Sequence, residues 1–243
     1  MNLLLLDQHE INEFGKAEII GPRAEHLLNV VGVSAGDTVR CGVFGGNMGR
    51  ATVDKTSSEN ELPHLTLSPQ LDKTPPPAST IELICALPRP KMLRRMVRSC
   101  AELGIKNITL INSFRVEKSY WQSPVLEYSN LQGILREGLE QAKDTLLPSL
   151  QLIPRFKPFV EDILPRMLSG KRGLLAHPYN ASVCPVALTE PSILAIGPEG
   201  GWNEFEVEKW REAGFEQVHL GDRILKVETA VPTLLSRLYP AGL

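Results

Sequence analysis

Three loops, each directly after a short apolar run, are the segments of this sequence best placed to carry chemistry. They cover residues 176–178, 196–201 and 220–225, and they include His177, Glu199 and Arg223. Ligands of α/β proteins bind beyond the carboxyl ends of parallel strands, so we expect the three loops to meet at one pocket. From their spacing alone, ordinary strand-to-helix turns explain the same loops equally well.

Several classes of site are excluded. The sequence contains neither G-x-G-x-x-G after a first strand nor G-x-x-x-x-G-K-[ST], so a Rossmann dehydrogenase or a P-loop NTPase is not expected. The four cysteines show no paired spacing (Cys41, Cys85, Cys100 and Cys184). We therefore expect no metal site and no disulfide framework, but reduced thiols in the cytoplasm.

Charge and hydropathy narrow the class of protein further. The net charge of −2 argues against a protein that coats nucleic acid indiscriminately, although a local basic cluster spans residues 89–98. That cluster either grips phosphates or forms a solvated helix face. No segment approaches the roughly 20 apolar residues of a membrane span. The run of leucines after Met1 is too short for a signal peptide and is interpreted as a buried first strand.

The pattern of elements predicts two domains. Residues 1–70 alternate like short strands joined by tight turns, with a helix near residues 23–31, and predict a small β-barrel. Residues 71–80 contain Pro75, Pro76 and Pro77 and are interpreted as a linker. Residues 81–243 alternate between strands and helices, which predicts an α/β domain on a parallel sheet. There Asn203 and Glu206 form a capping box, and Pro232 predicts a late start or a kink in the last helix.

Two motifs together resemble one known family. I-G-P-E-G-G at residues 196–201 and L-G-D-R-I-L-K-V-E-T-A at 220–230 are similar to the paired signatures of the RsmE-type methyltransferases of the SPOUT class. H-L-L-N-V at 26–30, E-L-G-I at 102–105, S-F-R at 113–115 and E-Q at 140–141 with Pro148 extend the resemblance over nearly the whole chain.

The resemblance implies a fold and a reaction. It implies a SPOUT-type parallel sheet with a C-terminal trefoil knot, a PUA-like barrel that binds RNA, and a homodimer with its cofactor site at the subunit interface. The expected activity is methyl transfer from S-adenosyl-L-methionine to ring nitrogen 3 of a uridine in 16S ribosomal RNA, alone or in the small ribosomal subunit. The cofactor-binding residues implied are Leu175, His177, Ile196, Gly197, Pro198, Glu199, Gly200, Gly201, Leu220, Gly221, Ile224 and Leu225.

The chemistry of the reaction suggests roles for three charged residues. A uridine nitrogen is a poor nucleophile until it loses its proton, so a cation near the uracil carbonyls would stabilise the anion. Arg223 is the candidate for that cation, Glu199 for the proton acceptor, and Glu228 for a group that orients Arg223. The competing interpretations are a structural ion pair between Arg223 and Glu228, and a Glu199 that caps the helix after Asn203 or faces solvent.

Contacts to RNA are expected in both domains. The candidates are Arg23 in the helix expected near residues 23–31, His26 and Arg115 from the resembling motifs, and four residues of the basic cluster, Arg89, Lys91, Arg94 and Arg95. Trp202 is expected either to stack on a base or to pack in the dimer interface. His177 is expected either to contact the cofactor or the RNA, or to have a purely structural role.

Three positions depart from the family pattern. Gly32, Ser99 and Asp144 stand where the family has basic residues. The departures lie outside the cofactor loops and keep two alternatives open. One is methylation of another RNA, and the other is a non-catalytic, cofactor-binding factor in RNA assembly.

Overall fold

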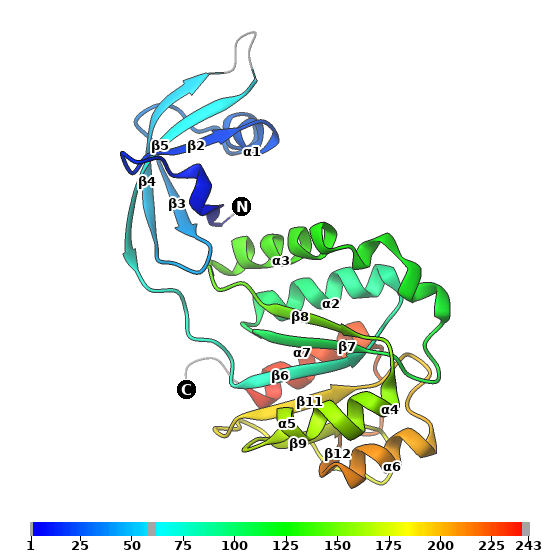
Figure 1. The fold of residues 1–243 in the computed structure, drawn as a ribbon. Helices are drawn as coiled ribbons and strands as arrows, with labels where there is room; N and C mark the ends of the chain where they lie inside the picture. Colours follow the sequence, from blue (N-terminus) through cyan, green and yellow to red (C-terminus); the bar gives the residue numbers. More distant parts are fainter. Residues whose placement is uncertain (1, 58–61, 240–243) are drawn as a thin grey trace. The chain divides into compact units, whose positions relative to one another are not determined.

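A computed structural model describes residues 2–57 and 62–239, which divide into two units. The first unit comprises residues 1–77 together with 139–147, and the second comprises 78–138 and 148–243. The chain thus returns to the first unit for a short segment at the end of a long helix, in addition to the change of unit in the proline-rich segment (Figure 1).

The first unit is a barrel-like sheet of five strands in the order β1-β3-β4-β5-β2. The strands are β1 (Leu4–Leu6), β2 (Ala17–Ile20), β3 (Thr38–Val43), β4 (Met48–Ser57) and β5 (His64–Lys73). Strand β5 therefore extends into the segment interpreted as linker. The short helix α1 (Pro22–His26) continues as η2 (Leu27–Val31).

The first strand lies inside this unit, as the leucine run predicted. Strand β1 pairs in parallel with β3, and each of its leucines is at most 1% exposed. Alternate residues of β3, β4 and β5 complete the core, among them Cys41, Val53 and Leu67. The alternation of apolar and polar residues along these strands therefore indicates which side chains face the core.

The second unit is built on a seven-stranded parallel sheet in the order β10-β12-β9-β11-β6-β7-β8. Its strands are β6 (Ile81–Ala86), β7 (Asn107–Ile111), β8 (Ser149–Ile153), β9 (Arg172–Ala176), β10 (Ser182–Val183), β11 (Ser192–Ile196) and β12 (Phe215–His219). The central strand β11 lies between β9 and β6, and all of its residues are buried. The parallel α/β sheet predicted for this part of the chain is confirmed.

The helices of the second unit follow the predicted pattern closely. They are α2 (Pro90–Glu102), α3 (Tyr128–Ala142), α4 (Phe156–Pro158), α5 (Leu164–Leu168), α6 (Glu204–Glu212) and α7 (Val227–Leu238). Helices α2 and α7 pack against each other. The predicted late start of the last helix is wrong, because α7 begins at Val227 and continues through Pro232. No helix within residues 2–57 and 62–239 is long and apolar enough to cross a bilayer.

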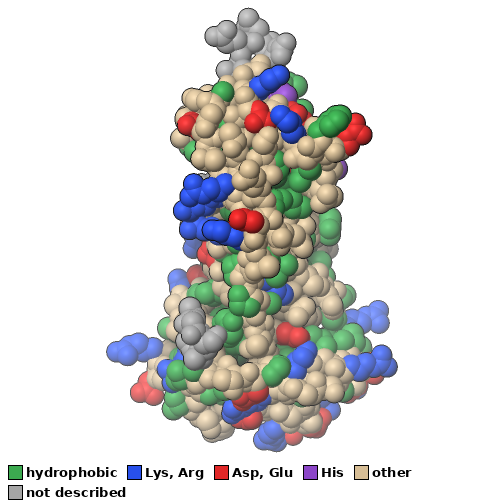
Figure 2. Space-filling model, turned by 90° about the vertical axis from the view of Figure 1, so that its left-hand side faces the viewer, with side chains coloured by type: hydrophobic (Ala, Val, Ile, Leu, Met, Phe, Trp, Pro, Cys, Tyr) green, Lys and Arg blue, Asp and Glu red, His purple; other side chains and the backbone are tan. Residues whose placement is uncertain are grey.

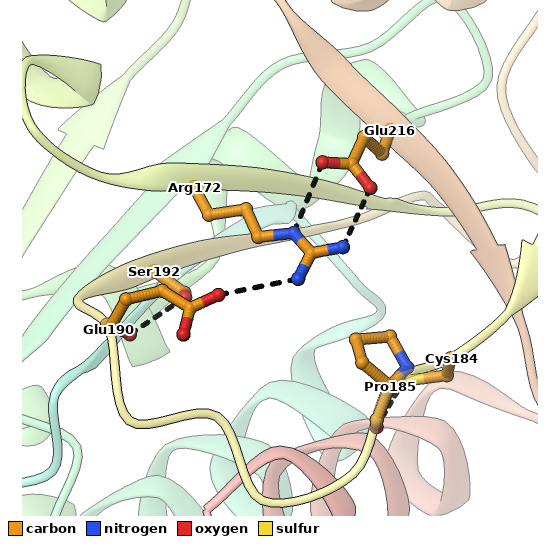
Figure 3. Close-up of polar contacts among 6 residues, drawn as sticks. All are labelled: Arg172, Cys184, Pro185, Glu190, Ser192 and Glu216. Carbon is orange, nitrogen blue, oxygen red and sulfur yellow. Dashed lines mark hydrogen bonds and ion pairs between the residues drawn. The ribbon is translucent and has the colours of Figure 1, made fainter.

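An arginine braces the amino-terminal ends of three strands of this sheet (Figure 3). Arg172 begins β9, and its Nε and Nη2 donate to the two carboxylate oxygens of Glu216 on β12 at 3.1 and 2.8 Å. Its Nη1 donates to Glu190, just before β11, at 3.3 Å. The carboxyl ends of the same strands, where the three loops begin, lie at the opposite edge of the sheet.

Candidate functional site

A cavity of about 470 Å³ opens where strands β9, β11 and β12 end. All three loops line it, and it has the size of a small-molecule site. Of the predicted cofactor-binding residues, only Leu175 does not line the cavity, because its side chain is fully buried in β9. Residues outside the quoted motifs also line the wall, including Tyr179, His219 and Leu234, and so do Val227 and Ala230 at the end of the second motif.

Gly197 and Trp202 form the tightest part of the wall. A Cβ added to Gly197 would lie 3.0 Å from Nε1 of Trp202, so this position has little room for a side chain. The indole is 4% exposed and packs against Phe156 and Trp210, with ring centroids 6.1 and 5.5 Å away. Stacking of Trp202 on an RNA base, one of the two expectations for it, is therefore wrong for this conformation.

Two ring nitrogens at the cavity are buried without a hydrogen-bond partner in the described part of the chain. They are Nε1 of Trp202 and Nδ1 of His177. Burial lowers the pKa of His177, which favours a neutral ring at pH 7, and the ring stands edge-on to Tyr179 at 5.8 Å. Buried polar atoms are normally paired, so these two atoms are suited to meet a bound ligand.

Glu199 connects the cavity to the start of helix α2. Its Oε1 accepts a hydrogen bond from the backbone N–H of Arg89, the residue that caps α2, at 3.2 Å. A carboxylate at this point interacts favourably with the helix dipole. The expectation that Glu199 caps the helix after Asn203 is therefore wrong, because Asn203 and Glu206 cap that helix themselves. Glu199 is exposed, as the alternative of a solvated side chain predicted, and it binds the start of α2 instead.

Two side chains, Arg115 and Glu206, connect the loop after β7 to the cavity. Nη1 of Arg115 donates to the carbonyl of Gly200, and Arg115 lines the cavity. The buried carboxylate of Glu206 accepts from the backbone N–H of Phe114 at 2.7 Å and from that of Asn203 at 3.0 Å. The capping box in the sequence predicted the bond between Asn203 and Glu206. No sequence pattern predicted the bond between Phe114 and Glu206, because the two residues lie 92 positions apart.

Arg223 lines the cavity and is exposed, whereas Glu228 lies in the first turn of α7 and does not line it. Within residues 2–57 and 62–239 no ion pair or hydrogen bond joins the two side chains. The orienting contact that the sequence suggested is therefore absent from the described part of the chain.

The other candidates for RNA contacts differ in how available they are. Lys91, Arg94 and Arg95 are exposed on α2. A hydrogen bond with Tyr120 raises the pKa of Arg89, whose guanidinium is thereby engaged. In the first unit Arg23 pairs with Glu10 at 2.7 Å and also donates to the carbonyl of Leu5, while His26 is half-buried.

The three departures from the family pattern have local explanations. Gly32 ends η2 with φ of 78°, a conformation in which an arginine would be strained. Asp144 is 3% exposed, and its Oδ1 accepts from the N–H of Leu146 at 2.9 Å. Ser99 is half-buried on α2. Two of the three positions are therefore poor places for an RNA-facing cation.

The chemical character of the cavity suits a nucleoside-containing ligand. Ile196, Leu220 and Leu225 supply apolar surface, and the glycines of the loop at 196–201 leave backbone groups accessible. No group of three or more His, Cys, Asp or Glu side chains that would hold a metal occurs in the described ranges.

Comparisons with known proteins give the cavity its context. The RNA methyltransferase domain family matches residues 74–239. The chain is 29% identical over 235 residues to ribosomal RNA small subunit methyltransferase E of Treponema pallidum, covering 95% of this chain and 87% of that protein. It is 24% identical over 241 residues to the enzyme of the same name from Bacillus subtilis, covering 96% and 93%.

A solved structure shares the fold. The ribosomal RNA small subunit methyltransferase E of Neisseria gonorrhoeae, bound to S-adenosyl methionine, superposes with a TM-score of 0.73 at 23% identity, over 97% of this chain and 95% of that one. The family match over most of the chain and the shared fold agree with each other. The chain belongs to the RNA methyltransferase family, among the RsmE-type enzymes.

Proposed function

We propose that this protein methylates ring nitrogen 3 of a uridine in 16S ribosomal RNA, with S-adenosyl-L-methionine as the methyl donor. The observation that carries the proposal is the single cavity lined by all three loops in a chain of this family. Relatives that match nearly the whole chain are named small-subunit ribosomal RNA methyltransferases, which supports the same substrate.

The residues of the cavity would hold the cofactor mainly through shape and backbone. Ile196, Leu220 and Leu225 would enclose the adenine, and main-chain groups of the loops at 196–201 and 220–225 would bond its edge. When bound, the cofactor supplies a methyl group already activated on a sulfonium. The protein's task is then alignment of donor and acceptor, which is worth up to about 7–11 kcal/mol.

Arg223 and Glu199 are the side chains proposed to act on the uridine. Arg223 lines the cavity and has no acidic partner among the described residues, so its guanidinium is available to stabilise the uracil anion. Glu199 lines the cavity and is oriented by its bond to the N–H of Arg89. It would accept the proton from nitrogen 3. Glu228 is kept as the candidate for orienting Arg223.

The finer architecture is proposed on the same grounds. Strand β11 lies between β9 and β6, both of which precede it in the chain, an order that is compatible with a trefoil knot. The five-stranded barrel-like sheet of the first unit is consistent with a PUA-like RNA-binding module. By resemblance to the family, a homodimer that completes the cofactor site and action in the cytoplasm, where ribosomal subunits are present, are proposed as well.

The test is methyl transfer from labelled S-adenosylmethionine to small ribosomal subunits, and to RNA extracted from them, prepared from cells that lack the modification. Digestion to nucleosides and mass spectrometry should reveal 3-methyluridine. The variant Arg223→Ala should lose methyl transfer and keep its affinity for the cofactor. Product in another RNA only would redirect the substrate, and cofactor binding without transfer to any RNA would favour the non-catalytic assembly factor.

A further inference from the structure

The barrel-like unit carries an unusual pair of cations on its outer face. Arg40 on β3 and Arg50 on β4 are register partners in the antiparallel ladder, and both side chains are exposed. Direct partners point to the same face of a sheet, so the two guanidinium groups stand side by side. Like charges in this arrangement destabilise a sheet unless another group compensates them.

Their neighbours on that face are Gly42 and Met48 in one direction along the strands and polar residues in the other. Thr38 and Thr52 form the register pair two positions along, and Gln70 on β5 is the partner of Arg50. The intervening residues, such as Cys41 and Ala51, point into the core. The face therefore offers two cations flanked by hydroxyl and amide groups.

No acidic side chain neutralises the pair. Within residues 2–57 and 62–239 neither arginine forms an ion pair, although the exposed Asp72 lies on the neighbouring strand β5. By contrast, Lys16 pairs with Asp54 at 2.9 Å and Arg23 with Glu10 at 2.7 Å. Figure 2, which views the side on which β4 lies in Figure 1, shows Lys and Arg side chains gathered on this unit.

The two arginines stand out because the first unit as a whole is negatively charged. Residues 1–77 and 139–147 contain seven Lys and Arg but twelve Asp and Glu. An acidic unit can approach a polyanion only through a local cationic face. Arginine is suited to that role because its planar guanidinium binds a phosphate through two hydrogen bonds.

We infer that Arg40 and Arg50 together bind the phosphate backbone of the substrate RNA, in place of the engaged Arg23 that the sequence suggested. The inference rests on the proposed function, which supplies an RNA as the partner. Thr38, Thr52 and Gln70 can donate further hydrogen bonds to phosphate or ribose oxygens. A site of this composition positions the RNA and does not read its bases.

The test compares Arg40→Gln/Arg50→Gln with Lys16→Gln/Lys55→Gln, which removes the same charge from the same unit. Binding of small-subunit RNA is measured from 50 to 300 mM salt. Loss of two phosphate contacts should lower the slope of log K against log salt by about 1.4–1.8 and weaken binding roughly tenfold or more. The control should keep the wild-type slope, and Arg40→Lys/Arg50→Lys should restore most of it.

Cofactor affinity and 3-methyluridine formation are followed in the same samples. An unchanged slope in the arginine variant, with the wild type producing 3-methyluridine, overturns the inference and leaves the proposed function standing. A lowered slope in a protein that transfers no methyl group supports the inference and refutes the proposed function. Thermal melting near that of the wild type excludes unfolding as the cause of a lowered slope.

Discussion

Replacement of Glu206 tests whether the loops after β7 and β11 depend on each other at the cavity. Its carboxylate is 2% exposed, and its two oxygens accept from the backbone N–H groups of Phe114 and Asn203 at 2.7 and 3.0 Å. It thereby ties the loop after β7 to the loop after β11. Arg115, next to Phe114, in turn holds the carbonyl of Gly200 at the cavity.

The expected effect of Glu206→Ala follows from these two bonds. Hydrogen bonds to charged groups contribute about 1.5–3 kcal/mol each, so the variant should lose about 3–6 kcal/mol of unfolding free energy. A chain of this size loses about 2–4 °C of Tm per kcal/mol, which predicts a fall of at least about 6 °C. Glu206→Gln retains one acceptor oxygen and should lose roughly half as much.

The assay combines thermal unfolding with cofactor titration at a temperature where both proteins are folded. Release of the loop at 113–115 should free the carbonyl of Gly200 and weaken cofactor binding. Glu204→Gln, an exposed change in the first turn of the same helix, is the control. Normal cofactor affinity in a destabilised Glu206→Ala protein would refute the coupling between the loops, and an unchanged Tm would refute the energetic argument itself.

Three further predictions concern the same unit. Gly197→Ala should cost about 1–3 kcal/mol of stability and weaken cofactor binding, because the added Cβ meets Trp202 at 3.0 Å; urea unfolding and cofactor titration check both effects. The lowered pKa of His177 means that the unfolded chain binds more protons below about pH 6.5, so stability should fall as the pH drops from 7 to 5. His177→Gln should remove that part of the pH dependence, and an identical profile for both proteins would contradict the burial argument. Arg172 and Glu216 are both partly exposed, so a double-mutant cycle should give a coupling energy of at most about 1 kcal/mol. A coupling energy well above that value would contradict the argument that solvent weakens this ion pair.

Local patterns in the sequence were sufficient for the elements and for the outline of the site. The leucine run predicted the buried β1, and alternation in residues 38–43 predicted the inward and outward sides of β3. The Asn203–Glu206 capping box marked the start of α6. Such features depend on neighbours a few positions apart, so they are visible without the fold. The motifs at 196–201 and 220–230 resembled the paired signatures of the family to which the chain belongs.

Only the tertiary structure decided which side chains are free to act. Arg23 was a candidate for RNA contact, yet Glu10 engages it. Arg40 and Arg50, which form no ion pair among the described residues, lay in no motif. Contact between Phe114 and Glu206, or between Gly197 and Trp202, depends on how distant loops meet at the ends of parallel strands. Residue type sets what a side chain can do, but its charge partners, burial and neighbours come from segments that are brought together only on folding.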